Sequence, residues 1–220
     1  MKTAKYKKDL LKVIDLYFIT DSSLSIKGVM VDVKCAIKAG VKIIQYREKE
    51  KSTRQMLQEA NKIKTMCRKN NVLFIVNDEI DIALAAGADG VHLGNDDMPY
   101  EIARKLLGKD KIIGLTVHNL EEAMQAQEAG ADYIGVSPVF ETKTKPDAGI
   151  PGGLNLIMEI KSNIKIPFVA IGGINENNIK SVLAAGAKSA AIISAIVTKS
   201  DVERECRKFR DIILTYHDEI

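Results

Sequence analysis

The chain has 220 residues, a formal net charge of +3 and 28% charged residues, the proportions of an ordinary soluble protein. Tryptophan is absent and aromatic residues make up only 5%, which argues against a surface that stacks nucleic-acid bases. No apolar run reaches the roughly 18 residues of a membrane span, and the amino-terminal stretch lacks a signal-peptide core. We therefore expect a cytoplasmic protein with neither nucleic acid nor membrane as a partner. Its three widely spaced cysteines, Cys35, Cys67 and Cys206, are expected to be reduced thiols.

Short apolar runs alternate with helical stretches along the whole chain. Residues 1–15 predict a helical extension, and strands are then expected at 16–20, 73–76, 112–115 and 168–171. Between these strands an Ala-Gly phrase recurs at 39–41, 86–89, 129–132 and 185–188, each time after a helical stretch and before another apolar run. Glycine just past a helix end is the usual left-handed cap, so each phrase marks a helix that stops and a strand that starts.

Eight strand signals that alternate with helices predict a single (β/α)8 TIM barrel over residues 1–220, with 1–15 as its amino-terminal helical extension. The strands are almost entirely apolar, as parallel strands covered on both faces should be. An open doubly wound sheet is the alternative, but it would require a glycine-rich nucleotide turn after the first strand. Thr20-Asp21-Ser22-Ser23 is no such turn.

The clearest site signal follows the second strand, where the apolar run 41–44 leads into Gln45, Arg47 and Lys49. Side chains alternate faces along a strand, so these three share the face that points into the barrel. An amide, a guanidinium and an ammonium at the carboxyl end of a barrel strand predict an anion pocket at the barrel mouth. A surface ion-pair cluster remains the alternative for this segment taken alone.

Other strand ends add polar groups to the same mouth. Asn77 and Asp78 follow the third strand, Asp97 the fourth and Thr116 the fifth, while the run 136–140 precedes Thr142, Thr144 and Lys145. Two carboxylates among cations are typical of a Mg²⁺ site that shares substrate phosphates, so Asp78 and Asp97 are expected to hold one ion. The alternatives are a helix N-cap for Asp78 and a turn residue for Asp97.

A second phosphate site is indicated by Gly172-Gly173 after the seventh strand and Ser194 after the eighth. Backbone N–H groups of a glycine turn and a helix start bind phosphate well, and barrels often place such a site there. Two phosphate sites imply two phosphorylated small-molecule substrates. Among the histidines we expect His92 to be a packed barrel residue and His217 to lie on the surface, and we leave the role of His118 open.

Seven motifs together resemble the thiamine-phosphate synthase family in order and spacing. They are QYREK (45–49), VND (76–78), GVHLGNDD (90–97), GLTVHN (114–119), GVSPVFETKTKPDAG (135–149), AIGGI (170–174) and IISAI (192–196). QYREK together with TKTKPDAG is highly specific, whereas AIGGI is shared with many phosphate-binding barrels. In that family a pyrimidinylmethyl diphosphate is joined to a thiazole phosphate, and pyrophosphate is released.

The resemblance implies a role for each matching residue. The pyrimidine diphosphate would be held by Gln45, Tyr46, Arg47, Glu48, Lys49, Asn77, Thr116 and Lys145, with Arg47, Lys49, Thr116 and Lys145 catalytic. The thiazole phosphate would be held by Thr142, Lys143, Thr144, Gly173, Ile193 and Ser194, and the Mg²⁺ ion by Asp78 and Asp97. Thr116 stands where the family more often has serine. Because threonine also carries a hydroxyl, the polar group is kept.

Two other functions are compatible with parts of this pattern. A thiazole tautomerase shares the fold and the thiazole-phosphate site, but an isomerase has no diphosphate to expel and no need for the cations with two carboxylates. A non-catalytic phosphate-ligand binder would have no reason to retain the diphosphate and metal groups. The sequence does not fix the oligomeric state, and a homo-oligomer remains open.

Overall fold

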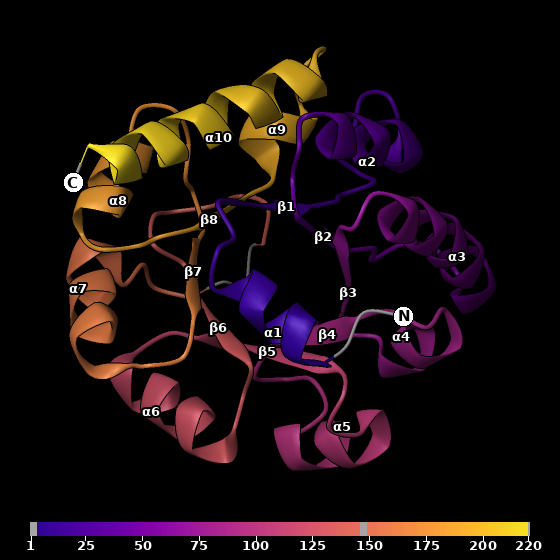
Figure 1. Ribbon diagram of the computed structural model, residues 1–220, viewed down its shortest axis with the longest axis horizontal. Coiled ribbons are helices and arrows are strands. Elements are labelled where there is room, and N and C mark those ends of the chain that lie inside the picture. Colours follow the sequence, from indigo (N-terminus) through magenta and orange to yellow (C-terminus); the bar gives the residue numbers. More distant parts are fainter. Residues whose placement is uncertain (1–3, 146–148, 220) are drawn as a thin grey trace.

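The structure, a computed structural model, describes residues 4–145 and 149–219. Within them eight parallel strands pair in chain order, and the eighth pairs with the first to close a barrel (Figure 1). The strands are β1 (Leu16–Ile19), β2 (Ile43–Tyr46), β3 (Leu73–Asn77), β4 (Gly90–Leu93), β5 (Ile112–Val117), β6 (Tyr133–Val136), β7 (Phe168–Ile171) and β8 (Ala190–Ile192). The predicted (β/α)8 TIM barrel is confirmed.

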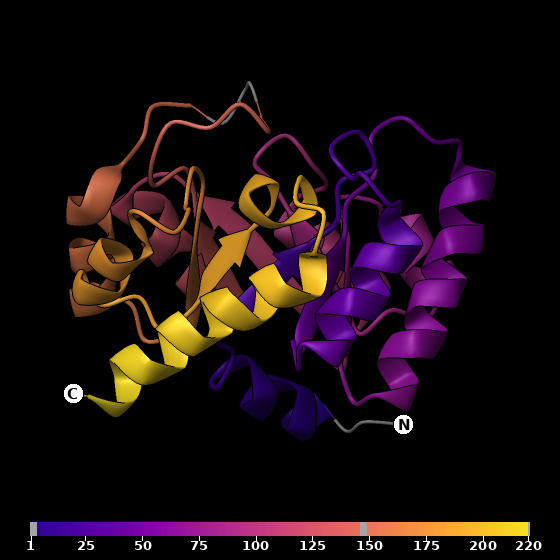
Figure 2. The same ribbon diagram turned by 90° about the horizontal axis from the view of Figure 1, so that it is seen from above.

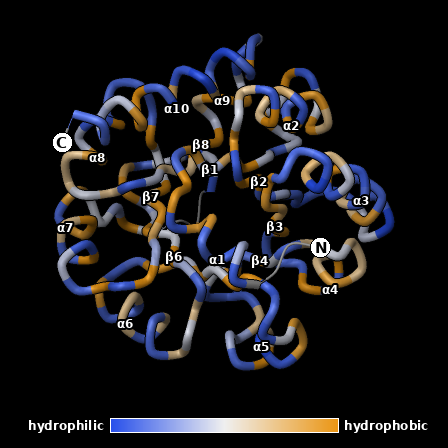
Figure 3. The backbone as a smooth tube through the Cα atoms, in the orientation of Figure 1, coloured by the Kyte–Doolittle hydropathy of each residue, from blue (hydrophilic) through white to orange (hydrophobic). Residues whose placement is uncertain are grey.

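Helices surround this barrel, and all but α1 lie around its outside (Figure 1). They are α1 (Ala4–Leu11), α2 (Val29–Lys38), α3 (Thr53–Lys69), α4 (Ile80–Ala85), α5 (Tyr100–Leu107), α6 (Leu120–Ala129), α7 (Gly153–Asn163), α8 (Ile179–Ala184), α9 (Ser194–Val197) and α10 (Val202–Asp218). Hydrophobic and hydrophilic residues alternate along most of them, as helices with one buried face require (Figure 3). None of the helices in the described ranges has both the length and the apolar character needed to cross a membrane.

The Ala-Gly phrases end helices as predicted. Gly40, Gly87, Gly130 and Gly186 all have positive φ, between 62° and 108°. At Gly130, the C-cap of α6, the backbone is left-handed and the next strand, β6, begins three residues later. Because a side chain there would be strained, glycine is the residue that allows the chain to reverse so tightly.

The strands have two buried faces with different partners. On β1, Leu16 and Phe18 pack outward against the helices, whereas Tyr17 and Ile19 belong to the cluster that fills the barrel interior. On β2 the same alternation places Ile43 inside and Ile44 outside. The inner face is therefore apolar low in the barrel and becomes polar only at its carboxyl end.

Helix α1 closes the bottom of the barrel, on the opposite side from the loop that follows β6 (Figure 2). Leu11 and Ile14 join the interior cluster. Lys8 Nζ lies 2.7 Å from Asp132 Oδ1, and Lys7 Nζ lies 3.5 Å from Asp89 Oδ1. The aspartates of two Ala-Gly phrases thus hold the amino-terminal helix against the barrel.

One apolar run was misplaced from the sequence. We expected 136–140 to be strand, but β6 ends at Val136 and residues 137–140 form a loop. Pro138 has no N–H to donate and cannot continue a central strand. The amides of Val139 and Phe140 instead donate to the carbonyls of Ile171 and Gly172, at 2.8 and 3.1 Å, so the loop is tied to the end of β7.

The packing inside the barrel gives a stability prediction at Gly114. A Cβ at this position would overlap the ring of Tyr133. We expect Gly114→Ala to lower the free energy of unfolding by about 1–3 kcal/mol, the usual cost of overpacking a core. Urea unfolding of the variant and of the exposed control Glu128→Ala measures it. If Gly114→Ala were as stable as the control, the barrel interior would accommodate the added Cβ, and the prediction of overpacking would be wrong.

Candidate active site

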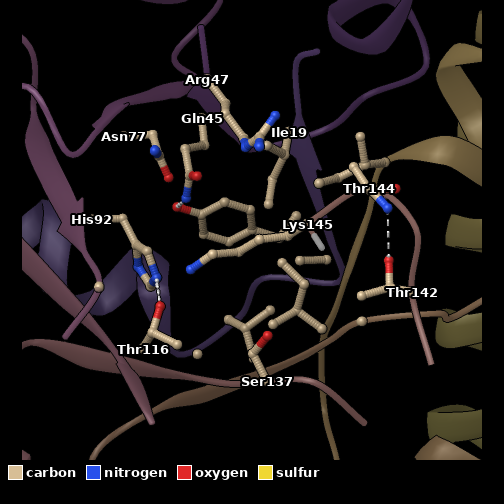
Figure 4. A pocket seen from close by; sticks show the side chains of 18 of the residues that line it. Ile19, Gln45, Arg47, Asn77, His92, Thr116, Ser137, Thr142, Thr144 and Lys145 are labelled. Carbon is tan, nitrogen blue, oxygen red and sulfur yellow. Dashed lines mark hydrogen bonds between the residues drawn. The ribbon is translucent and has the colours of Figure 1, made fainter. Parts of the chain in front are cut away.

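A cavity of ≈ 270 Å³ opens at the carboxyl ends of the strands; we call it the mouth cavity. Side chains from almost every strand end face it, among them Gln45, Asn77 and His92 (Figure 4). The structure brings together here most of the residues expected to form the site: Gln45, Arg47, Lys49, Asn77, Asp78, Asp97, Thr116, Thr142, Thr144, Lys145, Gly173, Ile193 and Ser194.

Three expected site residues, Tyr46, Glu48 and Lys143, do not line the mouth cavity. Tyr46 points out of the barrel, and its hydroxyl donates to Glu59 Oε2 at 2.8 Å. Glu48 is buried on the same outer side, where it accepts a hydrogen bond from Ser22 Oγ at 2.9 Å. The alternation along the strand places both away from Gln45 and its neighbours. Lys143 is exposed and lines an adjoining surface cavity instead.

The cations of the mouth cavity differ in their pairing. Arg47 Nη1 lies 2.5 Å from Asp21 Oδ2, in a pair that is mostly buried. Lys49 Nζ lies 2.5 Å from Asp78 Oδ2, with the lysine half exposed. Lys145 has no ion pair within the described parts of the chain, and its side chain extends across the cavity toward His92 (Figure 4). Lys145 is thus a mouth cation that no described carboxylate holds in an ion pair, although the Asp97 carboxylate lies nearby.

The two carboxylates lie close enough to perturb each other. Burial raises the pKa of Asp97 to about 6, and its hydrogen bond with Asp78 acts in the same direction. Burial also raises the pKa of Asp78, but the hydrogen bonds from Asp97 and Lys49 outweigh it and hold that pKa below its ordinary value. Ionisation of both carboxylates at once is therefore disfavoured, and Asp78, which is paired with Lys49, is the one that holds its charge more readily.

The sequence left open that Asp78 is a helix N-cap and that Asp97 is a turn residue, and the structure agrees only with the second. The N-cap of α4 is Glu79, so Asp78 is not a helix cap. Asp97 does act as a turn residue, since its Oδ2 accepts from the amide of Gly94 at 2.7 Å. A Cβ built on Gly94 would lie 3.3 Å from that oxygen and 3.9 Å from Lys145 Nζ. Asp97, the backbone of Gly94 and the Lys145 ammonium therefore gather at one edge of the cavity.

The floor of the mouth cavity is a chain of hydrogen bonds between side chains from five strands. Gln45 Nε2 donates to Tyr17 Oη at 3.0 Å, and Tyr17 Oη lies 2.7 Å from Tyr133 Oη. Tyr133 Oη lies 2.9 Å from His92 Nδ1, and His92 Nε2 lies 3.0 Å from Thr116 Oγ1 (Figure 4). His92 is packed inside the barrel, as expected, but it also lines the cavity.

Burial lowers the pKa of His92 from 6.5 to about 4; the charge of Asp78 raises it and that of Lys145 lowers it further. Between these two pH values the unfolded chain binds a proton that the folded protein does not. The neutral form of His92 therefore costs the folded protein nothing well above pH 6.5. As the pH drops from 6.5 toward 4, this group lowers the free energy of unfolding by up to about 3 kcal/mol. Urea unfolding of wild type and His92→Gln at about pH 7 and about pH 4 isolates the difference. Equal losses in the two proteins would contradict it.

The other two histidines lie outside the cavity lining. His118 Nδ1 is 3.0 Å from Glu122 Oε2, at the start of α6, where Asn119 caps the helix by accepting from the Glu122 amide. His217 is exposed near the end of α10, as expected. His118 thus contacts a helix terminus, and its Nδ1 also lies 3.4 Å from Nδ2 of Asn95, a residue that lines the mouth cavity.

Sequence reasoning missed the partners that hold the site in place. Asp21 fixes Arg47, and Thr20 Oγ1 accepts from the amide of Arg47 at 3.0 Å. These two residues directly follow the first apolar run, the same signal that identified the other strand ends. Tyr17 and Tyr133 lie inside apolar runs, and their pairing joins positions 116 residues apart, which no local pattern reveals.

The far end of the cavity is built from backbone and hydroxyl groups. Gly173 has a φ of 64°, and a Cβ there would lie 2.8 Å from Cβ of Phe140. Thr142 Oγ1 accepts from the amide of Thr144 at 3.3 Å, and Ser194 is the first residue of α9. These groups lie where the mouth cavity meets the adjoining surface cavity. Hydroxyl and backbone amide donors of this kind suit a phosphate monoester, while Glu141, Glu176 and Glu205 line the surface cavity beyond them.

Comparison with known proteins agrees with the motifs. Residues 16–196 match the family described as thiamine monophosphate synthase. Thiamine-phosphate synthase of Methanosarcina barkeri is 55% identical over 207 residues, 94% of this chain and 94% of that protein. The enzyme of the same name from Syntrophomonas wolfei is 48% identical, over 90% of this chain and 95% of its own length.

A solved structure gives the same result. Thiamine phosphate pyrophosphorylase from Pyrococcus furiosus superposes with a TM-score of 0.87 at 40% identity, covering 94% of this chain and 98% of that one. Both the family match and the coverage of these relatives extend over the whole barrel, including every strand end that lines the mouth cavity. The chain therefore belongs to the thiamine monophosphate synthase family and is a transferase.

Proposed function

We propose that the mouth cavity joins 4-amino-2-methyl-5-pyrimidinylmethyl diphosphate to 4-methyl-5-(2-phosphoethyl)thiazole, carboxylated or not, to give thiamine phosphate and pyrophosphate, with carbon dioxide as a further product of the carboxylated form. The observation that carries this proposal is the division of the cavity into two ends. One end gathers Arg47, Lys49 and Lys145 with two carboxylates, and the other offers hydroxyl and backbone donors. A diphosphate suits the first end and a phosphate monoester the second.

A single Mg²⁺ ion fits the first end. The donor set is Asp78 and Asp97, with no third His, Cys, Asp or Glu clustered beside them among the residues described. Magnesium is commonly held by one or two carboxylates while substrate phosphates and waters fill its other positions. When bound, the ion would supply positive charge to the departing diphosphate. The raised pKa of Asp97 agrees with this assignment, because a bound cation would offset both the burial that mainly raises it and the neighbouring Asp78 charge that adds to it.

The residues of the chain then act by electrostatics and positioning. The bond between the pyrimidine methylene carbon and the diphosphate oxygen breaks, and its electron pair leaves with the diphosphate. Arg47, Lys49 and Lys145 stabilise that growing negative charge. The thiazole nitrogen donates its lone pair to the carbocation that remains, which forms the C–N bond. No proton has to be removed, so the absence of a general base among the roles assigned here is no obstacle.

Two other functions fit the site less well. A thiazole tautomerase would use the hydroxyl and backbone donors but would leave the cations and both carboxylates without a substrate group. His118, the histidine whose role the sequence left open, lies outside the lining of the mouth cavity. A non-catalytic binder would gain nothing from Lys145, which has no ion partner in the described structure. Nor would it gain from placing the mutually repelling carboxylates of Asp78 and Asp97 beside it. The partners we propose are phosphorylated small molecules, with neither nucleic acid nor membrane, in the cytoplasm.

Mixing the two substrates with purified protein and Mg²⁺ tests the proposal. We expect pyrophosphate release only when both substrates and the ion are present, and its loss on addition of a chelator. Isomerisation of the thiazole without pyrophosphate release would instead identify a tautomerase. Tight binding of either substrate without any product would identify a binder.

The partition of the cavity gives a further prediction at Ser194. We expect Ser194→Ala to raise KM for the thiazole phosphate about 10-fold, the effect of losing one hydrogen bond, with kcat little changed. Steady-state kinetics with each substrate varied in turn measures this. Thr198→Ala on the neighbouring turn, whose hydroxyl donates to the Ser194 carbonyl at 2.7 Å, is the matched control. A change confined to KM for the pyrimidine diphosphate would contradict the two-ended site.

A further inference from the structure

The chain of hydrogen bonds on the floor of the mouth cavity has a direction. Gln45 Nε2 is a donor, so Tyr17 Oη accepts from it at 3.0 Å. The single hydroxyl hydrogen of Tyr17 then goes to its other neighbour, Tyr133 Oη, at 2.7 Å. Tyr133 Oη is thus an acceptor toward Tyr17, and its own hydrogen goes to His92 Nδ1 at 2.9 Å. Each step follows because a phenol has only one hydrogen to donate and because, in this direction, every hydroxyl hydrogen of the buried chain finds an acceptor.

The end of the chain fixes the histidine. Because Nδ1 of His92 accepts from Tyr133, it carries no hydrogen, and the ring is neutral with its hydrogen on Nε2. Nε2 therefore donates to Thr116 Oγ1 at 3.0 Å. The hydroxyl hydrogen of Thr116 is then free to point into the cavity that Thr116 lines. The low pKa that burial gives His92 agrees with a neutral ring.

We infer that His92, held in its Nε2–H form by Tyr17 and Tyr133, is a positioning residue that makes Thr116 a hydrogen-bond donor toward the substrate. The same chain leaves Gln45 Oε1 as an acceptor, because its amide nitrogen is used by Tyr17. The floor thus presents one acceptor and one donor, from β2 and β5. This pair matches a ring that carries an amino group beside an unprotonated ring nitrogen.

The inference deepens the proposed function and rests on it for the identity of that ring, an aminopyrimidine. The direction of the chain does not depend on the function. The opposite direction would need the Gln45 amide turned by half a rotation, with a hydrogen on His92 Nδ1 and Thr116 donating to Nε2. Thr116 would then offer only lone pairs to the cavity, which would suit a ring with the reverse pattern.

Histidine ¹⁵N spectra of the substrate-free protein at neutral pH test the direction. The protein has three histidines, and His118→Gln and His217→Gln remove the other two signals for assignment. We expect His92 to show a protonated Nε2 and a bare Nδ1. A proton on Nδ1, or on both nitrogens, would overturn the inference. Because no substrate is needed, this outcome is separate from any failure of the proposed function.

Kinetics with double variants test whether Tyr133 acts through Thr116. Thr116→Val is expected to raise KM for the pyrimidine diphosphate about 10-fold through the loss of one hydrogen bond, and Tyr133→Phe to raise it several-fold. Thr116→Ser, which keeps the hydroxyl, should restore KM to near the wild-type value.

If Tyr133 positions Thr116, adding Tyr133→Phe to Thr116→Val should not raise KM any further. The hydroxyl that Tyr133 orients is already absent in Thr116→Val. Multiplied effects of the two changes would show that Tyr133 acts only through general packing and would overturn the positioning role. Thermal unfolding of each variant confirms that it is folded before the kinetics are compared.

Discussion

Replacing Lys145 with alanine will lower kcat for thiamine phosphate formation about 10²–10³-fold, the cost of losing one preorganised electrostatic contact. Lys145 is the cation of the mouth cavity without an ion partner in the described structure, and it lies beside the backbone of Gly94 and the carboxylate of Asp97. Its ammonium is therefore placed to stabilise charge that grows as the C–O bond breaks. Because that charge is larger in the transition state than in the bound substrate, kcat should fall more than substrate affinity.

The loop that carries Lys145 supplies its own control. Lys143 stands two positions earlier, is also exposed, and lines the adjoining cavity rather than the mouth cavity. Lys143→Ala is expected to leave kcat within a few-fold of wild type. Turnover of Lys145→Ala that matched Lys143→Ala would remove the catalytic role given to Lys145. Single-turnover measurements would locate the loss in the chemical step rather than in product release.

Replacing Asp78 with asparagine will reduce turnover at least as strongly, by about 10³-fold, because two functions are lost together. Asp78 holds the Lys49 ammonium at 2.5 Å, and with Asp97 it forms the proposed ion site. Asparagine keeps the shape and removes the charge, so the fold should survive. When activity is measured at increasing Mg²⁺, Asp78→Asn should need more Mg²⁺ for half-maximal activity and should reach a lower maximal activity than wild type.

Asp81→Asn is the matched control for this variant. Asp81 lies three residues away in the first turn of α4, is exposed, and accepts only from the amide of Ile82 in the bonds recorded for it. It should behave as wild type. Normal activity of Asp78→Asn at saturating Mg²⁺ would contradict the ion site and leave Asp78 as a partner of Lys49 alone.

Local patterns in the sequence were sufficient for the barrel and for most of the charged and amide side chains that line its mouth. The Ala-Gly phrases located helix ends because a left-handed cap such as Gly130 is a local requirement of the backbone. The alternation of faces placed Gln45, Arg47 and Lys49 in the mouth cavity. Tyr46 and Glu48, which were expected to bind the pyrimidine diphosphate because of the family motif, instead contact Glu59 and Ser22 outside the mouth cavity.

What the sequence could not supply are contacts between distant strands. The run 136–140 looked like strand because it is apolar, yet Pro138 ends the ladder and the loop binds the end of β7. Asp21 meets Arg47 from another strand end, and Tyr17 meets Tyr133 across the barrel interior. Such pairs depend on closure of the barrel, so they become visible only when the strands are placed in space.

We propose that the two ends of the mouth cavity act on two phosphorylated substrates in one substitution. The most direct test of this proposal is the simultaneous time course of thiamine phosphate and pyrophosphate in a single reaction of the purified protein with both substrates and Mg²⁺. The account predicts that the two products appear together in equal amounts, and that Lys145→Ala slows both to the same extent. Pyrophosphate released without thiamine phosphate, or neither product with both substrates bound, would contradict it.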